Sequence, residues 1–147
     1  MRVSTKGRYG VRLMLDLALN AGKKAVSLKD VAGRQGISEK YLWQIVAPLK
    51  SAGLVEAVRG AHGGYRLARS PRTLTVRDIV EVLEGGIALV DCTLRPELCD
   101  RAADCVTREL WKSLGDILAG AMDAVTLADL AERHERRHRK SVLNYDI

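Results

Sequence analysis

The stretch SLKDVAGRQGISEKYLWQIVAPLKSAGLVEAVRGAHGGYRLA, residues 27–68, decides the fold of this 147-residue chain. Ser27 and Ser38 are each placed to cap a helix, because a serine hydroxyl accepts a hydrogen bond from a free N–H of the first turn. Apolar residues at helical spacing predict one helix over about 28–35 and a second that begins after Ser38. A tight turn at Gly36 joins them.

The second half of the same stretch predicts a small hairpin. Residues 54–59 and 65–68 are short runs suited to strands, and the glycine-rich segment Gly60–Gly64 between them tolerates the backbone of a tight turn. Pro48 removes an N–H near the end of the preceding helix, which predicts a kinked last turn. Two short helices followed by such a hairpin predict a winged helix-turn-helix.

The rest of the chain is predicted to be helical around one loop. Helices are expected at about 5–20 and 76–84, followed by a long amphipathic helix that ends near Val125 and a short last helix after Thr126. The fold class is therefore mainly α with a small β-hairpin wing and a long dimerisation helix. The expected division is a DNA-binding domain 1–70, a connecting helix 71–90, a cysteine loop 91–105, dimerisation and short C-terminal helices 106–132, and a charged tail 133–147.

The charge of the chain is divided between its two halves. Residues 1–77 hold 15 lysines and arginines against 4 acids, a net charge of +11, whereas residues 78–147 hold 9 against 14, a net charge of −5. A basic half of this kind attracts a polyanion, so we expect the N-terminal half to bind nucleic acid.

Composition narrows the cellular context and the class of protein. No apolar run is long enough to cross a membrane, and no signal-peptide cleavage pattern follows the N-terminus, which predicts a cytoplasmic protein. Three cysteines in a reducing compartment favour a metal or redox site over a disulfide framework. No nucleophile–base pair and no phosphate-binding loop is found, so an enzyme is not expected.

The predicted recognition helix carries polar and basic side chains away from its apolar face. Such side chains can donate to base edges and phosphates in the major groove, and the thin wing can approach the backbone or the minor groove. Trp43 lies beside this face and is interpreted as core, with contact to thymine methyl groups as the alternative. The candidate DNA-binding residues are Lys6, Ser38, Lys40, Tyr41, Gln44, Lys50, Arg59, Gly60, Gly63 and Gly64.

Cys92, Cys99 and Cys105 are spaced C-x6-C-x5-C. Thiolates are soft ligands that suit iron–sulfur clusters and zinc, but the close C-x2-C pairs of zinc loops are missing. Asp104 is expected to cap the long helix, which would place Cys105 in its first turn, where the helix dipole favours a thiolate. Buried, inert thiols are the alternative reading of the three cysteines.

Several motifs together resemble the IscR-like regulators of the Rrf2 family. They are residues 1–9, 14–18, 34–38, 41–42, 53–55, 58–60, 63–65 and 126–127. The resemblance covers nearly the whole chain and implies a homodimeric winged-helix transcription factor whose DNA binding changes with cluster occupancy. It also implies that the predicted recognition helix and Arg59 contact DNA. An acidic residue that discriminates between DNA sites in such regulators is replaced here by Trp43.

The same resemblance implies that Cys92, Cys99 and Cys105 hold an iron–sulfur cluster, with 2Fe-2S favoured over 4Fe-4S. Relatives add a histidine three residues past the last cysteine, where this chain has Arg108. Arginine has no acceptor atom and cannot ligate iron, so the fourth ligand is open. Glu109 is a candidate because it neighbours that position, while Asp91 and Asp104 flank cysteines and an external thiol or water could also serve.

The long amphipathic helix is expected to form the seam of a homodimer, because two-fold dimers match palindromic operators in double-stranded DNA. Two other functions remain open from the sequence. The cysteines could sense oxidants or nitric oxide directly, without a cluster. The chain could also be a small iron–sulfur carrier, although its basic half and wing argue against this.

Overall fold

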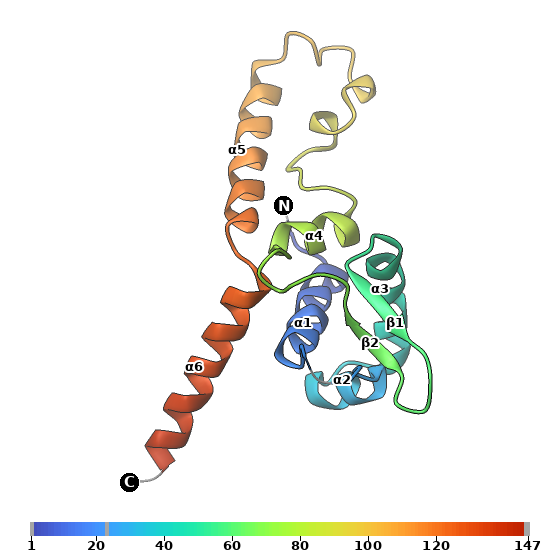
Figure 1. The fold of residues 1–147 in the computed structure, drawn as a ribbon. Helices are drawn as coiled ribbons and strands as arrows, with labels where there is room; N and C mark the ends of the chain where they lie inside the picture. The colour runs from blue at the N-terminus through green and yellow to red at the C-terminus, as the bar shows by residue number, and fades with distance from the viewer. Residues whose placement is uncertain (1, 23, 146–147) are drawn as a thin grey trace.

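The computed structural model describes residues 2–22 and 24–145. Figure 1 shows a body of helices and a hairpin, from which the last two helices of the chain project in opposite directions. The elements in chain order are α1 (Thr5–Leu19), α2 (Leu28–Gln35), α3 (Glu39–Ser51), β1 (Val55–Val58), β2 (Gly64–Leu67), α4 (Val76–Glu84), the 3-10 turns η1 (Asp91–Thr93) and η2 (Pro96–Leu98), α5 (Val106–Asp123) and α6 (Leu127–Tyr145).

Helix α1 forms the centre of the body. Its Leu13, Met14 and Leu17 are almost fully buried among apolar side chains of α2, α3 and α4. Gly10 lets α4 approach closely, because a Cβ atom at this position would collide with the Leu83 side chain. The core is aliphatic, as a sequence without phenylalanine requires.

The caps of the two central helices follow the sequence closely. The Ser27 hydroxyl accepts from the Asp30 N–H at 3.1 Å, and the Ser38 hydroxyl accepts from the Tyr41 N–H at 3.2 Å. Gly36 ends α2 with a φ of +63°, which favours glycine. Pro48 lies inside α3, and the helix continues past it to Ser51, so the expected loosening of this turn does not end the helix.

The wing is a two-stranded antiparallel hairpin in which Val58 pairs with Gly64. A further bridge joins the wing to the segment before α2: the Val26 N–H donates to the Tyr65 carbonyl at 2.9 Å, and the Tyr65 N–H donates to the Val26 carbonyl at 2.8 Å. A Cβ atom on Gly64 would collide with the Val26 carbonyl oxygen, so the absence of a side chain permits this bridge.

The C-terminal region differs from the sequence expectation in two respects. Cys105, rather than Asp104, is the N-cap of α5 and makes no side-chain capping bond. Helix α6 has 19 residues and is not short: it extends through the predicted charged tail, whose last two residues lie outside the described part of the chain. Residues 127–145 contain neither glycine nor proline and are rich in good helix formers, which explains the extension.

Hydrogen bonds attach both long helices to the body at one place. The Val76 N–H donates to the Val125 carbonyl and the Leu127 N–H donates to the Leu74 carbonyl, both at 2.9 Å. Leu127 is fully buried at this junction. Within residues 2–22 and 24–145, none of the helices is both long and apolar enough to cross a bilayer.

Candidate DNA-binding face and cysteine loop

Helix α3 separates its two faces cleanly. Leu42, Ile45 and Leu49 are buried, whereas the predicted contacts Lys40, Gln44 and Lys50 are exposed on the opposite side. Ala47 is also exposed. A helix whose outer side carries polar, basic and small side chains can enter a major groove.

Trp43 lies on this outer surface and not in the core. Its side chain is 52% exposed and packs edge-on against Tyr65 of β2, with the ring centroids 6.0 Å apart. The expectation of a core tryptophan was wrong because Trp43 is one turn from Lys40 and Ala47, on the side of α3 that faces the wing. Trp43 therefore connects the outer face of α3 with the wing.

The other predicted contacts are spread over three elements. Ser38 is exposed but its hydroxyl caps α3, and half-buried Tyr41 packs edge-on against Tyr9 at 5.9 Å. Lys6 is half-buried in the first turn of α1. That turn follows Ser4, whose N–H donates to the Glu84 carboxylate of α4. Lys6 thus lies on another element than α3 and the wing.

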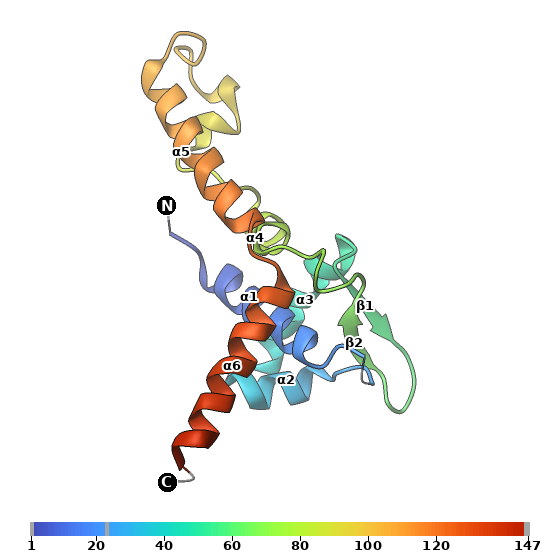
Figure 2. The same cartoon turned by 60° about the vertical axis from the view of Figure 1, so that its left-hand side comes forward.

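The wing tip presents little more than backbone around one arginine. Arg59 and Gly60 are exposed, and the Gly63 N–H donates to the Gly60 carbonyl at 3.0 Å, which closes the turn. A Cβ on Gly63 would meet that same carbonyl oxygen at 2.9 Å. Figures 1 and 2 show the wing tip on the same side of the body as α2.

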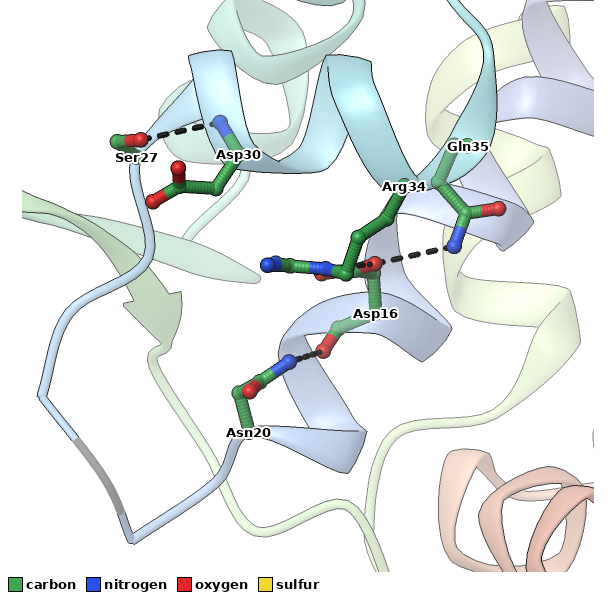
Figure 3. A network of polar contacts seen from close by, with 6 residues as sticks. All are labelled: Asp16, Asn20, Ser27, Asp30, Arg34 and Gln35. Carbon is green, nitrogen blue, oxygen red and sulfur yellow. Dashed lines mark hydrogen bonds and ion pairs between the residues drawn. The ribbon is translucent and has the colours of Figure 1, made fainter.

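A buried carboxylate fixes α2 against α1 (Figure 3). Asp16 is 2% exposed, and its two oxygens accept from Arg34 Nε and Nη2 at 3.0 and 2.7 Å and from Gln35 Nε2 at 3.0 Å. The hydrogen bond and charge of Asp16 raise the pKa of Arg34. Arg34 and Gln35 directly precede the turn at Gly36, so this network sets where α3 begins. Sequence reasoning missed this role of Asp16, because an acid in an apolar helix face gives no sign of its partners.

The three cysteines lie along one exposed loop between α4 and α5. Cys92 is half-buried in η1, Cys99 is exposed after η2, and Cys105 is half-buried at the start of α5; all three are free thiols. Three accessible thiols are a suitable donor set for a soft metal centre. As folded, the described residues bring no three cysteine, histidine or acidic side chains together as a metal site. The chemistry of the donors fits a cluster, and binding one would require the loop to rearrange.

The Arg108 guanidinium donates hydrogen bonds to two backbone carbonyls of the cysteine loop. Its Nε donates to the Cys92 carbonyl at 3.0 Å and its Nη1 donates to the Ala102 carbonyl at 3.5 Å. The side chain thereby connects two distant points of the cysteine loop to the first turn of α5. Glu109, the candidate fourth ligand, is exposed on the next position of the helix. The sequence showed only that Arg108 is not a ligand.

Cys105 has a distinct electrostatic environment. The hydroxyl of Thr107 lies 3.2 Å from its sulfur and, with the backbone N–H of Arg108, lowers the pKa of the Cys105 thiol below its usual value. The thiolate is the reactive form of cysteine toward electrophiles and metals. Cys105 is therefore the thiol of this loop whose surroundings favour reaction.

Helix α5 packs inward with small residues and exposes large ones. Gly115 and Ala119 are buried, and Gly115 lies beside the Ile87 carbonyl of the segment after α4. Val106, Leu110, Leu114 and Ile117 instead form an exposed apolar stripe. The stripe therefore does not pack on the winged domain. Ile117 is 67% exposed, which is unusual for isoleucine in a folded protein.

Known proteins with similar sequences are transcriptional regulators. The profile of the Rrf2 family, described as an iron-dependent transcriptional regulator, matches residues 3–133. CymR of Bacillus subtilis is 44% identical over 131 residues, which cover 89% of this chain and 90% of CymR. IscR of Escherichia coli is 37% identical over 135 residues, covering 92% of this chain and 83% of IscR.

Solved structures show the same likeness. The structure of T. potens IscR matches with a TM-score of 0.76 at 44% identity, covering 93% of this chain and 90% of that one. The structure of CymR, the global cysteine regulator of B. subtilis, matches with a TM-score of 0.75 at 43% identity, covering 90% of this chain and 98% of that one. The helices, the two-stranded wing and these relatives identify the fold as a winged helix of the regulator type. The chain therefore belongs to the Rrf2 family of DNA-binding transcriptional regulators.

Proposed function

We propose that this regulator is a cytoplasmic homodimer whose DNA binding responds to an iron–sulfur cluster held by Cys92, Cys99 and Cys105. The observation that carries the proposal is the position of these thiols: all three lie on one accessible loop that leads directly into α5. The description of the family as iron-dependent supports the same assignment.

The three thiolates would ligate iron, and we assign the fourth ligand position to Glu109, an exposed carboxylate beside Arg108. When bound, a cluster would supply a link between the thiolates that oxidants and nitric oxide can break. Arg108 would release the Cys92 and Ala102 carbonyls when the loop closes around the metal. This chain's own contribution is thus Arg108, which holds the loop in its present arrangement until the thiolates bind metal.

DNA would be contacted by α3 and by the wing. Lys40, Gln44 and Lys50 would reach base edges and phosphates in the major groove, and Trp43 would contact thymine methyl groups. Arg59 would enter the minor groove with the glycine backbone of the wing tip. Ser38, Tyr41 and Lys6 would contact phosphates.

A second copy of the chain would cover the apolar stripe of α5. A two-fold dimer joined along α5 would present two wings and two α3 helices to a palindromic operator. A shift of the loop would reach these elements through α5, because the α5–α6 junction is hydrogen-bonded to the segment that starts α4. Helix α4 in turn packs on α1 and α3.

The test is anaerobic purification with iron and sulfide analysis, absorption and electron paramagnetic resonance spectra, and a gel shift on the DNA upstream of the regulator's own gene. We expect a coloured protein, and loss of iron and colour in the triple variant Cys92→Ser/Cys99→Ser/Cys105→Ser. Glu109→Ala should change the spectrum, whereas an unchanged spectrum removes Glu109 from the ligand set. Colourless, iron-free parent protein would refute the cluster.

A second candidate function rests on the lowered pKa of Cys105. In this reading the regulator carries no cluster, and oxidation or nitrosation of the Cys105 thiolate changes DNA binding. The similarity to CymR, which is described as the global cysteine regulator of B. subtilis, favours this thiol mechanism. Iron content separates the two functions: the thiol mechanism predicts iron-free protein in which Cys105→Ser alone abolishes the response to oxidant.

A further inference from the structure

The outer half of α6 carries a cluster of positively charged side chains that lies outside the winged domain. Residues 133–140 contain five lysines and arginines and a single acid, Glu135. The inner end of α6 is held in the body by buried Leu127 and by Leu130, which packs against the core. From Glu135 to Leu143 every side chain is exposed, so this half of the helix has no covering in the described structure.

The cations lie together on the helix surface. Arg133, Arg137 and Lys140 are spaced i, i+4 and i+7, which places them on one face of an α-helix. Arg136 is 3.7 Å from the Glu132 carboxylate, whereas Arg137, Arg139 and Lys140 form no ion pair within the described residues. Like charges at this spacing repel each other, so the face gains most from a polyanionic partner.

DNA is the polyanion that a transcriptional regulator of this family binds. Figures 1 and 2 show the free end of α6 at the same end of the molecule as α2 and the wing tip, but on the other flank of the body from the wing. The cysteine loop, with its acids Asp91, Glu97, Asp100 and Asp104, lies at the opposite end. A duplex bound by α3 and the wing would therefore reach the free end of α6 only with the DNA beyond the half-site.

We propose that the basic face of α6, residues 133–140, binds the phosphate backbone of the DNA that flanks the half-site read by α3 and the wing. The contact is independent of sequence, because guanidinium and ammonium groups on a helix face meet phosphates and not base edges. It adds to the affinity of the winged domain and makes that affinity steeper in salt.

The test compares Arg137→Gln/Lys140→Gln with the parent protein on two duplexes. One duplex ends with the palindrome upstream of the regulator's own gene, and the other extends it by about one helical turn on each side. Arg72→Gln/Lys112→Gln is the control: it removes the same charge from the segment before α4 and from α5. Glutamine keeps the helix propensity of the residues that it replaces.

We expect the parent protein to gain affinity from the flanking DNA and the α6 variant to lose that gain. The slope of log K against log salt should fall by about 0.9 for each phosphate contact removed, while the control keeps the parent's slope. On the short duplex the α6 variant should bind like the control. Equal slopes for the α6 variant and the parent on the long duplex would overturn the proposal. So would a loss of dimer in the α6 variant by light scattering, because the basic face would then bind a second copy of the chain.

Discussion

At the scale of single residues, this protein depends on a few polar side chains whose partners are far away in sequence. Asp16 is the clearest example, since it is the one charged residue among the core positions that the structure describes. Its carboxylate is satisfied by Arg34 and Gln35, which lie 18 and 19 positions further along the chain. A buried charge is tolerated only when it is paired and hydrogen-bonded.

Replacing Asp16 by alanine should destabilise the protein and disturb the turn before α3. We expect the free energy of unfolding to fall by about 1–3 kcal/mol, with the lower end favoured because the Arg34 side chain is 46% exposed and can be hydrated. Urea denaturation measures the change. Asp116→Ala, which breaks an exposed ion pair with Lys112, is the matched control and should cost at most about 0.5 kcal/mol. Equal losses in the two variants would refute a special role of Asp16.

A second residue-scale prediction concerns the thiol of Cys105. Thr107→Val removes the hydroxyl that is the largest cause of its lowered pKa, so the pKa should rise toward the ordinary value. A thiol with a lower pKa ionises at lower pH, and the thiolate is the form that is alkylated. Alkylation of Cys105 should therefore begin at lower pH in the parent protein than in the variant. Mass spectrometry after iodoacetamide treatment of metal-free protein measures each site. Cys99 is the internal control, and a profile of Cys105 that does not move contradicts the assignment.

At the scale of elements, the wing is held by a backbone bridge and not by its own two strands alone. The reciprocal hydrogen bonds between Val26 and Tyr65 attach β2 to the segment before α2. Trp43 then packs against Tyr65 from the side of α3. The wing and α3 are thus positioned by shared contacts, which keeps constant the spacing of the two elements that are proposed to contact DNA.

Gly64→Ala should break this attachment. The new methyl group would collide with the Val26 carbonyl oxygen, so the Tyr65 N–H should lose its acceptor and exchange with solvent faster. Hydrogen exchange of that amide and operator affinity are the measurements, and both protection and affinity should decrease. Gly33→Ala in α2 is the control, because nothing lies within 4 Å of a Cβ atom there. It should stabilise the helix by about 0.5–1 kcal/mol. An unchanged exchange rate in Gly64→Ala would contradict the bridge.

At the scale of the whole molecule, the two long helices leave the body in opposite directions and each presents an uncovered surface (Figure 2). Helix α5 presents an apolar stripe, and the outer half of α6 presents cations. A monomer gains nothing from four large apolar side chains in water. The two surfaces call for different partners: an apolar one for α5 and an anionic one for α6.

Ile117→Glu should therefore convert a dimer into a monomer. A carboxylate on the stripe would be buried without a partner in the proposed seam, which costs far more than the contacts that it replaces. Light scattering after gel filtration measures the mass, and operator affinity should fall with it. Lys112→Glu adds an acid to the same helix outside the stripe and should leave the dimer intact. A parent protein that is monomeric at micromolar concentration would refute the seam itself.

The sequence by itself determined what depends on local chemistry. Serine caps, the glycine turn at Gly36 and the glycine-rich hairpin predicted the winged helix-turn-helix, because each acts within a few residues of its own position. The sequence also predicted that the basic N-terminal half binds nucleic acid and that the three cysteines form a metal or redox site. The length of α6 was locally encoded too, and the dense charge was wrongly interpreted as a tail that follows a short helix.

Only the tertiary structure decided which side chains meet. Trp43 lies on the surface because the wing folds back beside α3, and Arg108 reaches the Cys92 carbonyl because the loop returns to the first turn of α5. The same holds for Asp16, and for the stripe of α5 that faces away from the body. A one-dimensional pattern gives the periodicity of an element, but the partner of a face depends on how distant elements pack, and this is where the tertiary structure of the protein was needed.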